Sequence, residues 1–175
     1  MLANILAQKI KLIVLDIDGV MTDGGLYYDD EGRLSKRFHA QDGVGVKIAQ
    51  AAGIRVAVVS GMISKAVESR MRILGIEDYY QGFQHKVESV NAIREKYGLE
   101  WSELAYVGDD WIDFGPMRLV GLPIAVQNAQ PEVKELARLV TSASGGNGAV
   151  REAVIFILKA QGKYESLCNE WLNRG

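Results

Sequence analysis

The sequence predicts an α/β fold with a doubly wound, Rossmann-like parallel sheet, and three observations support this fold class. Short apolar segments alternate along the chain with longer segments that carry apolar residues at helical spacing. Gly53, Gly75 and Gly98 each follow one of the helical segments, where a helix C-terminus favours glycine. The first apolar segment, 11–17, is β-branched, too short to span a membrane and followed by the turn-forming Gly19. Such a segment is typical of a strand buried in a parallel sheet.

The individual elements follow from the same patterns in chain order. Four apolar runs predict strands at 12–16, 54–60, 104–108 and 123–126. Five segments with apolar residues at helical spacing predict helices at 44–52, 64–74, 86–97, 131–137 and 148–160. The run 26–38 breaks the alternation, because two short strand patterns flank the turn residues 29–32. We therefore expect a β-hairpin flap at about residues 25–38 and a C-terminal tail at about 162–175.

The length and charge of the chain limit its organisation and its partners. The 175 residues are enough for one domain with a sizeable core, so we expect a single domain over 1–175. Twenty Lys and Arg against 22 Asp and Glu give a formal net charge of −2, which supplies no basic field for nucleic acid or an anionic membrane. Cys168 is the single cysteine, and residues 1–11 lack the pattern of a secretion signal. We expect a cytoplasmic protein that binds neither nucleic acid nor membranes.

Polar residues occur where the first two predicted strands end. Asp16 and Asp18 lie at the carboxyl end of the first strand, and an unpaired buried carboxylate there is costly. Ser60 and Gly61 end the second strand, just before a helix N-terminus that suits a phosphate group. Open α/β sheets bind ligands at the carboxyl ends of their strands. These four residues are therefore candidates for a common site.

A second group of candidates comes from later in the chain. Asp109 and Asp110 follow the strand at 104–108, and Asp113 lies one turn further on. Lys86 begins a helix from which its ammonium group can face the same centre. Several carboxylates with few histidines and cysteines in the chain favour Mg²⁺, which is commonly bound by one or two carboxylates and a phosphate oxygen. The expected substrate therefore carries a phosphoryl group.

Structural roles are the alternative for several of these residues. Asp110 and Asp113 can be stabilised by the dipole of the helix that follows them. Ser60 can cap a helix, and Lys86 can be an ordinary solvated lysine. A phosphate-accepting receiver module also gathers aspartates, a hydroxyl and a lysine at the end of a parallel sheet. Receivers, however, take the acceptor aspartate from a later strand, so the order of the residues here argues against that binding function.

Taken in order, these segments resemble the haloacid dehalogenase superfamily of phosphotransferases. The matching segments are DIDGVMTDG at 16–24, Ser-Gly at 60–61, Lys86 and GDDWID at 108–113. The resemblance implies that the Asp16 carboxylate attacks phosphorus and forms an aspartyl-phosphate. Asp18 would protonate the leaving alkoxide and then activate water for the second step.

The same resemblance implies a role for the remaining site residues. It places Mg²⁺ between the Asp16 carboxylate, the Asp18 backbone carbonyl and Asp109, with Asp110 and Asp113 supporting this group. Ser60 and Lys86 are implied to stabilise the charge on the phosphoryl oxygens.

Four further matches resemble the lidless (C0) family of 3-deoxy-D-manno-octulosonate 8-phosphate (KDO 8-P) phosphatases. They are DGVMTDGG at 18–25 with YYDDEG at 27–32, FHAQDGVGV at 38–46, YVGDDWID at 106–113 and GGNGAVREAV at 145–154. The resemblance implies a sugar-acid phosphate as substrate and the absence of a cap domain. It also implies a homo-oligomer, a tetramer, in which neighbouring subunits close the active sites.

One position departs from this family. Relatives that cleave KDO 8-P place an arginine after the Ser-Gly or Thr-Gly pair, sister enzymes acting on nonulosonate 9-phosphates place a glutamate, and this chain has Met62. We expect Gly61 and Met62 to line the substrate site. The contact with the substrate carboxylate is then either missing or supplied by another residue such as Arg33, Arg37 or Arg70. Phosphatase activity on a KDN or N-acetylneuraminate 9-phosphate stays open as an alternative, as does an inactive enzyme kept as an assembly partner.

Overall fold

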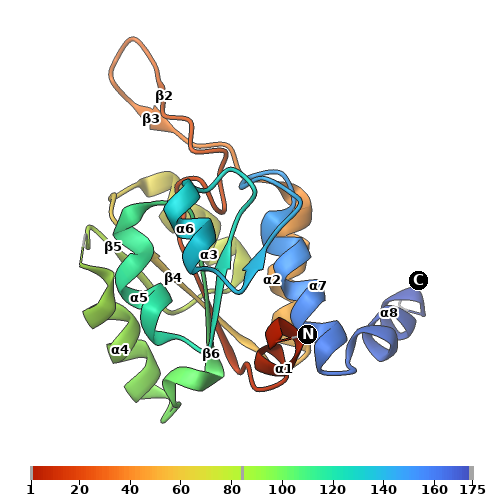
Figure 1. Ribbon diagram of the computed structural model, residues 1–175. Coiled ribbons are helices and arrows are strands. Elements are labelled where there is room, and N and C mark those ends of the chain that lie inside the picture. The colour runs from red at the N-terminus through yellow and green to blue at the C-terminus, as the bar shows by residue number, and fades with distance from the viewer. Residues whose placement is uncertain (1, 84, 174–175) are drawn as a thin grey trace.

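A six-stranded parallel sheet forms the centre of the computed structural model, which describes residues 2–83 and 85–173 (Figure 1). Its strands are β1 (Leu12–Leu15), β4 (Arg55–Ser60), β5 (Tyr79–Gln81), β6 (Leu104–Gly108), β7 (Leu122–Ala125) and β8 (Leu139–Val140). The strand order β5-β4-β1-β6-β7-β8 places β1 between β4 and β6. All four residues of β1 are fully buried. The chain therefore winds outward in both directions from β1, which confirms the predicted doubly wound sheet.

Helices cover both faces of this sheet (Figure 1). The helices are α1 (Leu2–Ala7), α2 (Ala40–Ala51), α3 (Lys65–Leu74), α4 (Lys86–Lys96), α5 (Phe114–Leu119), α6 (Pro131–Leu136), α7 (Ala149–Ala160) and α8 (Tyr164–Leu172), with 3₁₀ turns η1 (Trp101–Glu103) and η2 (Trp111–Asp113). Helix α8 packs on α7 and extends away from the sheet (Figure 1). One layer packs α2 against α3 and α7, and α7 against α1. The other layer packs α5 against α4 and α6.

The main differences from the predicted elements are at the periphery. The sequence patterns did not predict α1 and α8, nor the edge strands β5 and β8, which have only three and two residues. Strands as short as β5 and β8 carry too little periodic signal to be recognised. The helix expected after Asp110, for which no bounds were predicted, is present as η2 followed by α5. Helix α2 also begins at Ala40, four residues before the predicted start, because glycines interrupt its apolar pattern. The central strands, which position the site, were predicted correctly.

The predicted hairpin is present and consists of β2 (Tyr27–Tyr28) and β3 (Leu34–Ser35) around the turn at 29–32. It projects from the body of the protein near the carboxyl ends of the strands (Figure 1). A bridge between Thr22 and Phe38 closes its base. Between β1 and β4 the chain forms only this hairpin and α2, and between β4 and α4 it forms α3 and β5. The described chain therefore has no inserted cap domain, as predicted. None of its helices has the length and apolar character needed to cross a bilayer.

Candidate active site

The sheet order brings three predicted site residues to one edge. Asp16, Ser60 and Asp109 follow or end the neighbouring strands β1, β4 and β6. The backbone N–H of Asp16 donates to the carbonyl of Val107 at 3.1 Å, which continues the β1–β6 pairing. Asp16 is 2% exposed and Ser60 is 1% exposed. A carboxylate and a hydroxyl are thus held together at the carboxyl edge of an otherwise apolar sheet.

Lys86 is buried and connects two of the carboxylates. Its Nζ lies 2.7 Å from Asp16 Oδ1 and 2.7 Å from Asp113 Oδ1. Asp113 Oδ1 also accepts a hydrogen bond from the hydroxyl of Tyr106 at 2.7 Å. Its Oδ2 accepts from the backbone N–H groups of Asp109 at 2.9 Å and Asp110 at 3.3 Å. Asp113 therefore holds both the lysine and the acidic turn in place, and Lys86 is not a solvated surface lysine.

The acidic cluster fits a magnesium ion. Asp16, Asp109 and Asp113 each offer a carboxylate oxygen within 4.8 Å of the others. Both oxygens of Asp113 are already engaged in the contacts above. Asp109 Oδ1, in contrast, is buried without a hydrogen-bond partner among the described residues. Since a buried carboxylate oxygen without a partner is costly, Asp16 and Asp109 are the two carboxylates suited to hold Mg²⁺.

The pKa shifts of the cluster also favour a bound metal ion. Burial, together with the charge of Asp113, raises the pKa of Asp16 to about 7, although Lys86 opposes this shift. Burial and the charges of Asp16 and Asp113 raise the pKa of Asp109 to about 8. Burial alone would lower the pKa of Lys86, but the carboxylates of Asp16 and Asp113 outweigh it and raise this pKa. The site thus has excess negative charge that a divalent cation would neutralise.

We predict that stabilisation by Mg²⁺ increases with pH. Unfolded aspartates titrate near 4, whereas the pKa values of Asp16 and Asp109 are about 7 and about 8 without metal. The metal-free folded state therefore binds more protons than the unfolded state between about pH 4 and 8, so its stability falls as the pH rises through this range. Mg²⁺ must displace these protons, so its affinity rises over the same range. Thermal unfolding with Mg²⁺ and with EDTA at pH 6 and pH 8.5 measures the difference.

The expected result is a larger Mg²⁺-dependent increase in Tm at pH 8.5 than at pH 6. Asp109→Asn serves as the control, because its Tm should respond little to Mg²⁺ at either pH. An equal increase at both pH values in the unmodified protein would contradict the prediction.

A pocket of about 250 Å³ opens at this edge of the sheet. It is lined by Asp16, Asp18, Gly19, Gly24, Gly61, Met62, Asp109, Asp110 and Ile112. Ser60, the last residue of β4, does not itself line the pocket. Its Oγ accepts a hydrogen bond from the backbone N–H of Met62 at 3.3 Å. The predicted residues Gly61 and Met62 therefore do line the pocket that contains the carboxylates.

The three arginines predicted to bind substrate do not line this pocket. Arg33 pairs with Asp29 and Glu31 at the exposed tip of the hairpin. Arg70 donates to the carbonyl of His39 at 3.4 Å. Arg37 is bound at the base of the hairpin, as described below. Within one chain the pocket therefore lacks a guanidinium contact from any of them, and a role in substrate binding stays a prediction.

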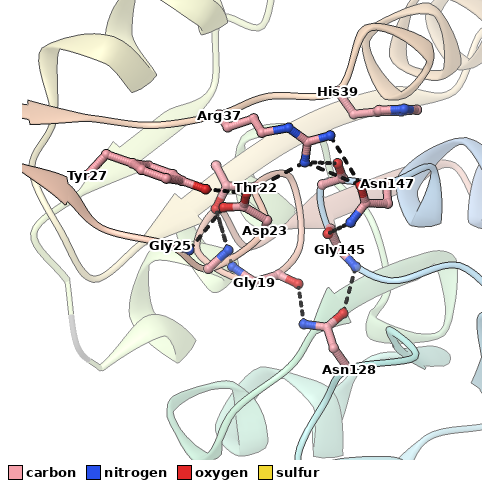
Figure 2. A network of polar contacts seen from close by, with 12 residues as sticks. Gly19, Thr22, Asp23, Gly25, Tyr27, Arg37, His39, Asn128, Gly145 and Asn147 are labelled. Atoms are coloured by element: carbon pink, nitrogen blue, oxygen red, sulfur yellow. Dashed lines mark hydrogen bonds and ion pairs between the residues drawn. The ribbon is translucent and has the colours of Figure 1, made fainter.

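Arg37 joins the hairpin to the glycine-rich loop before α7 (Figure 2). Its guanidinium donates to the carbonyl of Gly146 at 3.1 Å and to Asn147 Oδ1 at 3.3 Å. It also lies 3.6 Å from Asp23 Oδ2, which accepts a hydrogen bond from the hydroxyl of Tyr27 at 2.7 Å. These contacts fix the base of the hairpin to the body of the protein.

The glycine-rich loop in turn supports the loop that follows β1. Asn128 donates to the carbonyl of Gly19 at 3.2 Å and accepts from the N–H of Gly145 at 2.6 Å (Figure 2). A Cβ at Gly145 would lie 1.7 Å from the Gly19 carbonyl oxygen, so only glycine fits there. The matching glycines of the sequence thus allow close backbone contact between two distant segments.

Three residues of the site were missed at the sequence level. Tyr106 lies in the buried strand β6 and gave no signal beyond an ordinary apolar pattern, and Asn128 is an isolated amide in a loop. Lys36 contacts Asp18 Oδ1 through a fully buried side chain. Lys36 precedes Phe38, the bridge residue at the hairpin base, by two residues. In an extended segment this spacing places both side chains on the same side, which was only a weak indication that Lys36 points inward.

The fold and the site first define a class of protein. A parallel sheet with two adjacent acidic strand ends, a buried lysine and a serine at the neighbouring strand is the arrangement of a metal-assisted phosphotransferase. The family profile of the haloacid dehalogenase-like hydrolases matches residues 76–153. The 3-deoxy-D-manno-octulosonate 8-phosphate phosphatase KdsC of Escherichia coli K12 is 42% identical over 159 residues, which cover 91% of this chain and 85% of that protein.

Solved structures show the same similarity. The 3-deoxy-D-manno-octulosonate 8-phosphate phosphatase from Moraxella catarrhalis, crystallised with a magnesium ion, a phosphate ion and KDO, has a TM-score of 0.94 at 36% identity and covers 97% of both chains. The cobalt-bound deoxy-D-mannose-octulosonate 8-phosphate phosphatase (YrbI) from Haemophilus influenzae has a TM-score of 0.91 at 36% identity, covering 96% of this chain and 99% of that one. The chain therefore belongs to the haloacid dehalogenase superfamily of hydrolases and, within it, to the 3-deoxy-D-manno-octulosonate 8-phosphate phosphatase family.

Proposed function

We propose that the protein is a Mg²⁺-dependent phosphatase that releases inorganic phosphate from 3-deoxy-D-manno-octulosonate 8-phosphate, in the synthesis of a lipopolysaccharide precursor. The observation that carries the reaction class is the buried Asp16 carboxylate, which is bound by Lys86 and clusters with Asp109, whose Oδ1 has no hydrogen-bond partner among the described residues. The substrate is supported by the names of the relatives, which cover most of this chain.

The chemistry proceeds in two steps on this chain's residues. An Asp16 oxygen attacks phosphorus as the ester P–O bond breaks, while Asp18 gives a proton to the leaving alkoxide. Asp18, now a carboxylate, then takes a proton from water as the water oxygen attacks phosphorus and Asp16 is released. Bound Mg²⁺ supplies charge neutralisation between the anionic nucleophile and the anionic substrate.

The remaining site residues act by holding charge and geometry. The Lys86 ammonium lies against the Asp16 oxygen and stabilises negative charge at the reacting centre. Ser60, with Lys86, would stabilise charge on the phosphoryl oxygens, and its Oγ also accepts a hydrogen bond from the Met62 N–H in the turn that lines the pocket. Asp109 would hold the metal together with Asp16, and Asp110 and Asp113 support the turn that carries Asp109. We assign the Asp18 backbone carbonyl to the metal as well.

Assembly and location belong to the same proposal. We propose one domain over 1–175, with a flap at about 25–38 and a tail at about 162–175, that forms a tetramer whose subunits close each other's sites. Exposed apolar residues on the hairpin, including Tyr27 and Tyr28, favour such an association. A cytoplasmic location stays a prediction.

We predict that KDO 8-P is the preferred substrate in a panel of phosphate esters. Phosphate release would be measured with Mg²⁺ against KDO 8-P, the 9-phosphates of KDN and N-acetylneuraminate, and a hexose 6-phosphate. We expect kcat/KM for KDO 8-P to exceed that for the hexose phosphate by about 100-fold or more, since a site fitted to polar groups rejects analogues that lack them. Preference for a nonulosonate 9-phosphate would support the alternative substrate that Met62 leaves open. Preference for the hexose phosphate would overturn the substrate but not the reaction.

A further inference from the structure

Lys36 directs a charged side chain into the protein from a segment that is otherwise exposed. Its neighbours Ser35 and Arg37 are exposed, whereas the Lys36 side chain is 0% exposed. This follows from the alternation of an extended chain, in which successive side chains point to opposite sides. The Lys36 ammonium contacts Asp18 Oδ1. Burial of an ammonium group is costly unless it is paired, so this contact explains why the side chain can lie there.

Asp18 is bound by Lys36 on one side and faces the pocket on the other. The Asp18 side chain is 26% exposed, and the residue lines the pocket with Asp16 and Asp109. The chain turns directly after it at Gly19, which has a φ of +84°. A carboxyl group has two oxygens in one plane, so a fixed contact at Oδ1 restricts the direction in which Oδ2 points. Lys36 thus limits the orientation of Asp18 relative to the pocket.

Anchoring of the hairpin does not depend on this ion pair. The bridge between Thr22 and Phe38 closes the hairpin base. Arg37 separately binds Gly146 and Asn147 of the loop before α7 (Figure 2). The hairpin leg is therefore held independently on its other side. The hairpin can therefore be anchored without the buried Lys36. Its contact with Asp18 then indicates that Lys36 acts on Asp18.

We propose that Lys36 is a positioning residue that holds the Asp18 carboxyl in the orientation needed for proton transfer. The proposal rests on the proposed function, because Asp18 is the proton donor and acceptor of that reaction. In the first step, the proton on Asp18 Oδ2 moves to the oxygen of the breaking P–O bond, so that an alcohol leaves and Asp18 becomes a carboxylate. In the second step, this carboxylate takes a proton from the attacking water. Lys36 itself exchanges no proton.

The dependence on the leaving group tests this role. Lys36→Met removes the ammonium group but keeps an apolar side chain of similar length. p-Nitrophenolate leaves without a proton, whereas a sugar alkoxide needs one. In single-turnover measurements, we expect Lys36→Met to slow alcohol release from KDO 8-P about 100-fold and to change nitrophenolate release from p-nitrophenyl phosphate by less than about threefold. Under multiple-turnover conditions, p-nitrophenyl phosphate should then show an initial burst of nitrophenolate followed by slower turnover, because water activation by Asp18 is slowed.

Two controls separate positioning from other effects. Lys47→Met removes a lysine that binds the carbonyl of Leu74 outside the pocket, and it should leave both first-turnover rates unchanged. In an Asp18→Asn background, Lys36→Met should cause no further loss with KDO 8-P, since the group that it positions no longer transfers protons. The retained first-turnover rate of nitrophenolate release also shows that the variant is folded.

Other results would overturn the proposal. An equal loss with both esters would show that Lys36 stabilises the phosphoryl group and does not position Asp18. Unchanged rates with both esters would show that the ion pair has no catalytic role. If the unmodified protein prefers another alkyl phosphate, the same comparison is made with that ester, and the role of Lys36 is tested unchanged. If the unmodified protein hydrolyses no phosphate ester, it is the proposed function that fails.

Discussion

Asp16→Asn is expected to lower turnover of KDO 8-P by a factor of roughly 10⁴ or more, the largest effect on activity of any single replacement in the chain. An amide cannot form the aspartyl-phosphate, and it also removes one of the two carboxylates suited to Mg²⁺. The measurement is phosphate release at saturating Mg²⁺, with acid-quenched protein examined by mass spectrometry for a phosphorylated aspartate. The unmodified protein should show the adduct, and the variant should not.

The loss must come from chemistry and not from unfolding. Burial raises the pKa of Asp16 to about 7, so at pH 8 the folded protein holds a carboxylate that its surroundings disfavour. Without metal, a neutral asparagine should therefore leave the Tm at pH 8 at least as high as in the unmodified protein. Asp78→Asn is the matched control and should retain full activity, because Asp78 binds Lys96 and Tyr97 outside the pocket. Full activity of Asp16→Asn would refute the assignment of the nucleophile, whereas no activity in either this variant or the unmodified protein would support the inactive assembly partner.

Asp113→Ala is expected to cause the largest loss of stability, about 3–5 kcal/mol in the free energy of unfolding. Asp113 is fully buried and accepts hydrogen bonds from the Lys86 ammonium, the Tyr106 hydroxyl and two backbone N–H groups. Alanine leaves these buried donors without this acceptor, and Lys86 keeps only Asp16. Urea or thermal unfolding with EDTA measures the change without a contribution from metal binding.

A nearby aspartate provides the control for this replacement. Asp110 is exposed and caps η2 by accepting from the backbone N–H of Trp111 at 2.7 Å. Asp110→Ala should therefore cost only about 1 kcal/mol. Asp113→Asn, which keeps an acceptor oxygen, should lie between the two. Similar losses for Asp110→Ala and Asp113→Ala would contradict the view that Asp113 organises the site.

Asp110 and Asp113 show how much of the site could be predicted from the sequence. Both follow β6 in the same short segment, and the sequence supported the same interpretation for each, a supporting role or a favourable charge at a helix start. The structure gives them different environments. The turn η2 buries Asp113, whereas Asp110 is exposed and lines the pocket. One helical turn thus decides which carboxylate meets Lys86, and no pattern of residue types reveals this.

The sequence also could not predict what the arginines contact. Arg33, Arg37 and Arg70 were offered as alternatives for binding the substrate carboxylate, because Met62 cannot do so. In the structure, each is engaged elsewhere: with hairpin carboxylates, with the glycine-rich loop and with the His39 carbonyl. Lys36, beside Arg37, was not considered although it reaches Asp18.

The sequence by itself determined the parallel sheet and the hairpin, predicted Asp16 and Asp109 as metal-binding carboxylates, and indicated the family through its resemblance to known motifs. It could do so because strand patterns, turn residues and acids at strand ends are local features, and parallel strands bring their carboxyl ends to one edge. Only the tertiary structure decided that Asp113 holds Lys86 against Asp16, that Asn128 joins two loops and that Lys36 binds Asp18. These contacts join segments far apart in the chain, and the packing of buried polar groups, not their order in sequence, selects which partners meet.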